Sequence, residues 1–145
     1  MRRYETIYIL RPSLNEEEIN SLVERTNGII TALGGQIIEL DKWGMKKLAY
    51  FIKKESQGFY IYCDYAGTPE AVSEMERKFR IDDAVLRFLT VKKAESITAE
   101  EISEAIARIA EKDTVTEESE TADDTDASSS DEKVDSTKAE PTSNE

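Results

Sequence analysis

Side chains that could perform chemistry are scarce in this chain of 145 residues, which contains no histidine and one cysteine. Histidine is the residue that most often serves as a general base or a metal ligand near neutral pH. Cys63 lies in a β-prone run without an imidazole partner, so the sequence favours a structural thiol over a nucleophile. Asp82-Asp83 has no further ligands at metal-binding spacing, and no glycine-rich phosphate-binding motif is present. We therefore predict a protein that is not an enzyme, with no catalytic residue, metal, cofactor or small-molecule substrate.

One segment, residues 42–54, combines positive charge with aromatic rings along an extended hairpin arm. Lysines neutralise phosphates, and neighbouring aromatic rings can lie against sugars and bases. Edge strands also carry lysines that prevent aggregation between sheets, so RNA contact and edge protection both remain open. The lysines concerned are Lys42, Lys46, Lys47, Lys53 and Lys54.

The charge of the chain is divided sharply along its length. The whole chain has a formal net charge of −12. Residues 1–93 hold 15 Lys and Arg against 14 Asp and Glu, a net charge of +1, whereas residues 94–145 carry −13. The acidity therefore belongs to the C-terminal part and does not exclude RNA binding by the body. The single cysteine fits a reducing compartment, and no signal-peptide core or membrane-length apolar run is present, so we expect a cytoplasmic protein with no membrane partner.

The elements that position these residues follow from periodicity and punctuation. Strand patterns cover residues 3–11, 58–65 and 85–93, and residues 36–52 form one long strand broken near Trp43-Gly44. A helix follows the Asn15 cap and ends at Gly34-Gly35, and a second helix begins at Thr68-Pro69. The order βαββαβ predicts an α+β, ferredoxin-like fold, a four-stranded antiparallel sheet with two helices on one face.

The C-terminal part divides into two segments. Thr98 and Glu101 form a capping box, which makes residues 94–112 a linker with a candidate short amphipathic helix. Residues 113–145 are rich in acidic residues, Ser and Thr and lack aromatics, so we predict a disordered acidic tail after the folded domain at 1–93.

The sheet face away from the helices is a second candidate binding surface. If Ile7 and Ile9 face the helices, Tyr8 points the other way, because neighbouring strand residues alternate. Both alternating sets of the last two strands keep tyrosines or aliphatics, so this face suits an RNA-stacking platform or a protein dock better than plain solvent. The alternative is that these are scattered apolar residues on a small sheet, with no binding role. The candidate partner-binding residues are Tyr8, Tyr60, Tyr62, Leu89 and Val91.

Five segments stand in a characteristic order and spacing: Arg3-Tyr4-Glu5, Trp43-Gly44 with residues 47–53, Gly58-Phe59-Tyr60, residues 79–82 and residues 85–88. Together they resemble a known family, the bacterial ribosomal protein six of the small subunit. The resemblance implies a place in the small subunit among its other components, bound to the central domain of 16S rRNA as a heterodimer with ribosomal protein eighteen. Lys46 and Lys47 stand where relatives often have arginine, which keeps the charge but loses the bidentate donor. The rRNA-contact candidates that the resemblance adds to the arm lysines are Arg2, Arg3, Arg80 and Arg87.

A regulatory module on the same fold, which binds a small ligand or assembles with itself, is the alternative, because fold alone does not separate these functions. The lysines of the hairpin arm favour RNA. Co-sedimentation with small ribosomal subunits at raised salt would discriminate the two.

Overall fold

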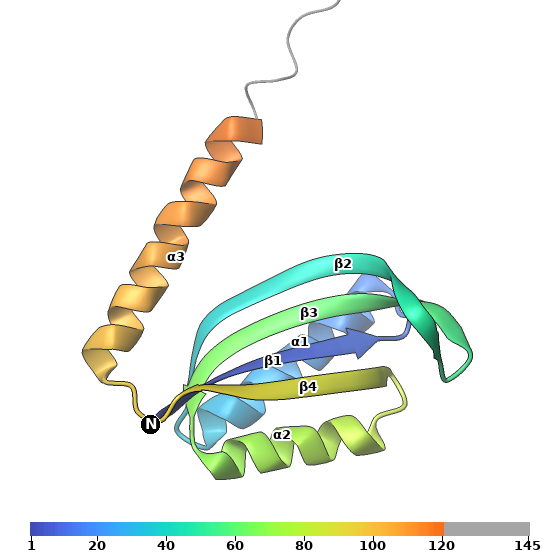
Figure 1. Ribbon diagram of the computed structural model, residues 1–145, viewed down its shortest axis with the longest axis horizontal. Coiled ribbons are helices and arrows are strands. Elements are labelled where there is room, and N and C mark those ends of the chain that lie inside the picture. The colour runs from blue at the N-terminus through green and yellow to red at the C-terminus, as the bar shows by residue number, and fades with distance from the viewer. Residues whose placement is uncertain (121–145) are drawn as a thin grey trace, which may run out of the picture.

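A computed structural model describes residues 1–120, with side chains to residue 113. Four strands, β1 (Arg2–Leu10), β2 (Gln36–Ile52), β3 (Glu55–Gly67) and β4 (Val85–Ala94), form one antiparallel sheet in the order β2-β3-β1-β4. Helices α1 (Glu16–Ala32) and α2 (Pro69–Ile81) lie together on one side of this sheet (Figure 1). The predicted ferredoxin-like βαββαβ fold is confirmed. No helix within residues 1–120 is long and apolar enough to cross a membrane.

The two helices begin where their capping residues require. Asn15 accepts a hydrogen bond from the Glu18 backbone N–H (2.8 Å), and the Glu18 carboxylate accepts one from the Asn15 N–H (2.9 Å). This reciprocal pair satisfies donors that the first helical turn leaves unpaired. Thr68 caps α2 by accepting from the Ala71 N–H (3.3 Å), and proline at the first helical position needs no N–H partner. Gly34, with φ of +79°, ends the α1 region in a left-handed conformation.

The long strand β2 is irregular in three places, the first of them between Ile37 and Glu39. Its pairing with β3 shifts between Lys42 and Gly44, where Gly44 has a φ of +84° that favours glycine. A larger irregularity follows Lys47. From the Lys47–Gln57 pair to the Ile52–Glu55 pair, β2 advances five residues while β3 advances two, so β2 carries three extra residues. The predicted irregularity near Trp43-Gly44 is confirmed, and the other two were not predicted.

The core lies between the sheet and the two helices. Strands contribute Tyr8, Ile61 and Tyr65, and α2 contributes Met75 and Phe79. The ring of Tyr8 lies 4.8 Å from that of Phe79 and is fully buried. Tyr8 was predicted on the opposite face, and this prediction is wrong. Ile7 and Ile9 share their set with the charged Arg3 and Glu5, whereas Tyr8 shares its set with Tyr4 and Leu10, and it is the set of Tyr8 that packs on the helices.

A third helix, α3 (Ala99–Glu120), packs on the other side of the sheet at one end (Figure 1). The Glu101 backbone N–H donates to Thr98 Oγ1 (3.3 Å), and the Glu101 carboxylate accepts from the Thr98 N–H (2.8 Å), as the capping box predicted. Its buried contacts join Ile97, Ile102 and Ala105 to Ile38 of β2 and Ala66 of β3. The segment predicted as a linker with a short helix is therefore packed on the sheet. The helix also continues past residue 112 to Glu120, and the rest of the predicted disordered tail, from residue 121, lies outside the described residues.

Candidate nucleic-acid and protein interface

The sheet face turned away from α1 and α2, here called the open face, is defined by the strand register. Ile7 of β1 lies between Tyr62 of β3 and Leu89 of β4, and directly opposed residues share a face. By the same rule Ile9 lies beside Tyr60, and Glu5 lies between Asp64 and Val91. Tyr60, Tyr62, Leu89 and Val91 therefore stand on the predicted face, with Ile7 and Ile9 in place of Tyr8. That they bind a partner stays a prediction.

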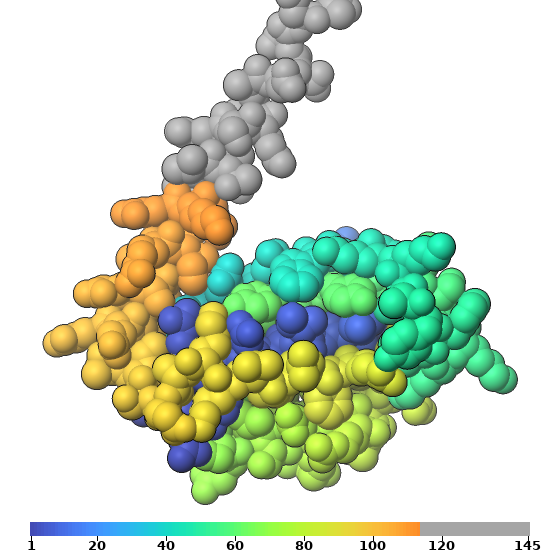
Figure 2. Space-filling view, in the orientation of Figure 1, coloured from blue at the N-terminus to red at the C-terminus, as the bar shows by residue number. Residues whose placement is uncertain are grey.

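The open face presents a continuous surface of strand side chains (Figure 2), several of them apolar. Leu89 is 62% exposed, and Val91 beside it is also exposed. Trp43 of β2 stacks on Tyr62, with the rings 5.6 Å apart and 6° from parallel. Exposed apolar side chains that gather in one patch are more typical of a contact surface than of a face that stays in water. In Figure 2, α3 stands at one end of this surface and the β2–β3 hairpin at the other.

A charged cluster ties the strands together at the α3 end of the open face. The carboxylate of Asp64, 1% exposed, accepts from Arg3 Nε (3.0 Å), Arg3 Nη2 (2.8 Å) and Lys93 Nζ (2.8 Å). Burial alone would raise the pKa of Asp64, but the hydrogen bonds from Arg3 and Lys93 outweigh it and hold the pKa below its ordinary value. The hydrogen bond to Asp64 likewise raises the pKa of Arg3. Arg3, a predicted rRNA contact, is therefore engaged inside the protein.

The arm, residues 42–57 of β2 and β3, carries the predicted lysines in different surroundings. Lys42 donates to Asn20 of α1, and Lys53 Nζ donates to the Val85 carbonyl oxygen (3.1 Å). The Lys46 ammonium lies 5.1 Å from the centre of the Trp43 ring, a cation–π distance. Lys47 and Lys54 are exposed. The structure thus gathers all five lysines on one arm but ties two of them to other elements.

The predicted arginines are dispersed. Arg87 of β4 lies on the open face beside the arm, with its guanidinium 5.5 Å from the Tyr50 ring. Arg80 instead belongs to α2, where it pairs with Glu76 (3.3 Å) on the helical side. Arg2 pairs with Glu95 (3.6 Å) near α3. Only Arg87 joins the lysines of the arm.

Features that the sequence analysis missed lie mainly around the arm. The Trp43–Tyr62 stack and the buried Asp64 were not predicted as parts of a site, and the exposure of Tyr50 and Phe51, which belong to the predicted segment 42–54, could not be read from the sequence. The dipeptide Trp43-Gly44 carried a signal, because a glycine within a strand often marks a bulge that redirects its neighbours. No signal in the sequence indicated that Asp64 would be buried and paired, since its partners come from strands that are distant in sequence.

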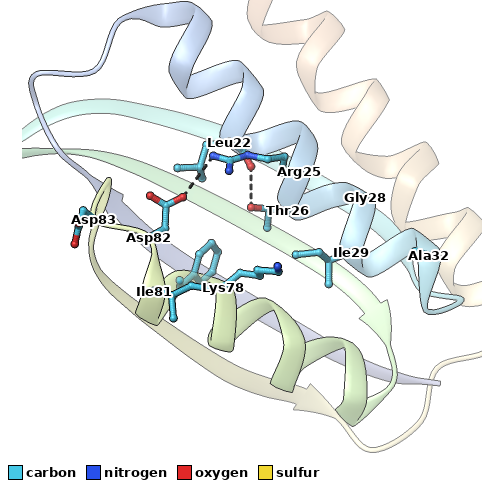
Figure 3. A pocket seen from close by; sticks show the side chains of 11 residues that line it. Leu22, Arg25, Thr26, Gly28, Ile29, Ala32, Lys78, Ile81, Asp82 and Asp83 are labelled. Carbon is cyan, nitrogen blue, oxygen red and sulfur yellow. Dashed lines mark hydrogen bonds and ion pairs between the residues drawn. The ribbon is translucent and has the colours of Figure 1, made fainter.

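A groove of about 790 Å³ lies on the helical side, between α1 and α2 (Figure 3). Its walls are mostly apolar, with Leu22, Ile29 and Phe79 among them. At the rim of the groove, Arg25 forms an ion pair with Asp82 (3.4 Å), so the two charges satisfy each other. The groove lies across the sheet from the open face and includes no residue of the arm. The thiol of Cys63 is buried elsewhere in the core, where desolvation raises its pKa to about 12, so it is a poor nucleophile.

Comparison with known proteins identifies the family. The family model described as ribosomal protein S6 matches residues 3–92. The small ribosomal subunit protein bS6 of Desulfotalea psychrophila is 56% identical over 119 residues, covering 81% of this chain and 75% of that protein. The bS6 of Caldanaerobacter subterraneus is 47% identical over 92 residues, covering 63% of this chain and 97% of the relative. The crystal structure of 30S ribosomal protein S6 from Thermotoga maritima matches with a TM-score of 0.60 at 27% identity, covering 80% of this chain and 97% of that one. The chain therefore belongs to the ribosomal protein S6 family, a component of the small ribosomal subunit, as the resemblance implied.

Proposed function

We propose that this protein binds the central domain of 16S rRNA in the small ribosomal subunit, as a heterodimer with ribosomal protein eighteen. Its place of action is then the cytoplasmic ribosome. The observation that carries the proposal is the juxtaposition of an exposed apolar patch on the open face with a lysine-rich arm at one end of the same sheet. Two adjoining surfaces of different chemistry suit a protein that joins a second protein to RNA.

The open face supplies the protein contact. The centre of the face combines Ile7, Tyr62, Leu89 and Val91, whose side chains are apolar or aromatic. Aromatic and aliphatic residues at the centre of an interface, with charged residues at its rim, are typical of specific protein contacts. Ribosomal protein eighteen is therefore expected to cover this patch.

The arm supplies the RNA contact. Residues 42–54 contain five lysines and no acidic residue, and Arg87 lies beside them. Lys46, Lys47 and Lys54 together with Arg87 are the best phosphate-contact candidates. Arg3, Lys42 and Lys53 are weaker candidates, because each already donates a hydrogen bond inside the protein. Since residues 1–93 carry a net charge of only +1, the isolated protein should bind RNA weakly and the heterodimer strongly.

A charge introduced into the open face tests the protein contact. Leu89→Asp should weaken the complex with ribosomal protein eighteen strongly, because a carboxylate would be buried without a partner. Ile81→Asp is the matched control, since Ile81 is 65% exposed but ends α2 on the helical side. Titration calorimetry of each variant with ribosomal protein eighteen gives the affinities. Equal effects of the two substitutions would remove the open face as the dock.

Removal of arm lysines tests the RNA contact. Lys47→Gln in the preformed heterodimer should weaken binding to central-domain rRNA and flatten its salt dependence. Lys78→Gln on α2 is the control for loss of one positive charge away from the arm. Filter binding at several salt concentrations measures both quantities. An arm variant that keeps wild-type affinity and salt slope would show that Lys47 makes no phosphate contact.

A further inference from the structure

The tip of the arm, residues 48–55, has an unusual backbone. The three extra residues of β2 lie between Lys47 and Ile52, so the strand bulges away from its partner just before the turn. Bulges redirect side chains and are frequent beside functional sites. Here the bulged segment contains Tyr50 and Phe51, and both are exposed.

The turn that closes the tip is strained. Lys53 and Lys54, between the paired Ile52 and Glu55, have φ of 47° and 66°, so two consecutive side-chain-bearing residues adopt left-handed conformations. A two-residue hairpin turn of this kind normally uses Asn-Gly, because each such residue other than glycine is disfavoured. Strain of this kind persists where surrounding contacts over-determine the backbone, and it is common at binding sites.

Three contacts fix the tip to the body. Lys53 Nζ donates to the Val85 carbonyl oxygen (3.1 Å), and Glu55 pairs with Arg11 (3.4 Å). Arg87 donates to the Tyr50 hydroxyl and lies over its ring. The tip is therefore fixed in place before any partner arrives. These contacts engage Lys53 and Tyr50 and leave Lys54 and Phe51 exposed to a partner.

Phe51 is the most conspicuous side chain of the tip, because it is 73% exposed. Contact with a flat apolar group would remove this ring from water and is therefore favourable. The residues around Phe51 indicate which kind of group that is. The segment 42–54 has five lysines and no carboxylate, and Lys54 lies three residues from Phe51. A nucleotide brings both a flat base and a phosphate, so this pairing favours RNA over a protein side chain.

We propose that Phe51 stacks on an unpaired base of the bound RNA, that Lys54 contacts a phosphate of the same strand, and that Lys53 positions the tip without touching RNA. The inference rests on the proposed RNA-binding function and adds to it the chemical class of the contact, a single-stranded nucleotide. Both contact side chains are exposed on a tip that its contacts with the body hold in place.

The test uses the heterodimer with ribosomal protein eighteen and a central-domain fragment of 16S rRNA, with four single substitutions. Phe51→Leu keeps an apolar side chain but removes the ring, and should weaken binding about ten-fold, within the range for one stacked base, without changing the salt slope. Phe51→Trp keeps an aromatic ring and should bind the RNA fragment with wild-type affinity. Lys54→Gln should lower the salt slope by about 0.7, the value for one phosphate contact on a single strand. Lys53→Asn should leave the slope unchanged.

Three outcomes would overturn the inference. Wild-type affinity in Phe51→Leu would show that the ring makes no stack. A loss of affinity for ribosomal protein eighteen in that variant, measured without RNA, would show that Phe51 belongs to the protein interface. A lower salt slope in Lys53→Asn with no change in Lys54→Gln would reverse the roles of the two lysines. Failure of the wild-type heterodimer to bind the fragment at all would instead overturn the proposed function, and this inference with it.

Discussion

Replacement of Asp64 by alanine removes the group that joins β1, β3 and β4 at the α3 end of the open face. Its carboxylate accepts three hydrogen bonds of 2.8–3.0 Å from Arg3 and Lys93. Hydrogen bonds to charged groups contribute about 1.5–3 kcal/mol each, so a simple sum is about 4.5–9 kcal/mol. The side chains of Arg3 and Lys93 are 27% and 33% exposed, however, and water can solvate them once the carboxylate is gone. We therefore expect a loss of about 3 kcal/mol in the free energy of unfolding, the lower end for a broken buried pair.

The loss should depend on pH in one direction. The folded-state pKa of Asp64 is lowered, so its contribution to stability is present above the unfolded-state pKa of about 3.9 and is lost as pH falls through the folded-state pKa. The difference between wild type and Asp64→Ala should be constant from about pH 5 to 8 and should shrink below about pH 4.

Urea unfolding followed by far-ultraviolet circular dichroism measures these free energies without adding salt. Glu74→Gln is the control, because Glu74 pairs with Arg77 at 2.7 Å on the surface of α2, where the Arg77 side chain is 54% exposed and we expect no measurable change. The reasoning fails if the Asp64 variant loses no more stability than this control. It fails equally if the difference persists unchanged at pH 3.

Three further predictions concern packing and reactivity. Gly58→Ala should destabilise the protein by about 1–3 kcal/mol, because the added Cβ would lie 2.3 Å from Ile9 Cγ2; urea unfolding gives the value, and a neutral effect would mean that Ile9 moves freely. Ile102→Ala should release α3 from the sheet and reduce the free energy of unfolding by about 2 kcal/mol. Faster hydrogen exchange confined to α3 would identify this local release, whereas unchanged exchange would contradict the packing. The Cys63 thiol, with a pKa raised to about 12, should react with a thiol reagent at pH 8 only as fast as the protein unfolds; rapid reaction of the native protein would contradict its burial.

The sequence predicted the fold well because its local signals agree with one another. Asn15 and Thr68 marked the helix starts, and Gly34 marked the end of α1. Local chemistry determines such features. The face of β1 was predicted wrongly, because the prediction gave weight to Ile7 and Ile9 and not to the charged Arg3 and Glu5 on the same alternating set.

The candidate site was predicted in outline only. The lysines of the arm could be found from composition, but their contacts could not. Lys53 reaches Val85 only because a bulge and a left-handed turn bring the tip beside the start of β4. The packing of α3 was likewise out of reach, since Ile38 and Ala66 are distant from it in sequence. Long-range geometry decides both.

The sheet order has a consequence for synthesis of the chain. The first strand made, β1, is a central strand whose partners are residues 59–67 and 85–94. At about 5–20 residues per second, β1 waits roughly three to ten seconds for the start of its first partner. The β2–β3 hairpin joins strands that are neighbours in sequence, so it can form as soon as β3 has been made and before β4 exists. During translation, the arm is therefore assembled before the sheet that holds it is complete, and β4 closes the sheet last.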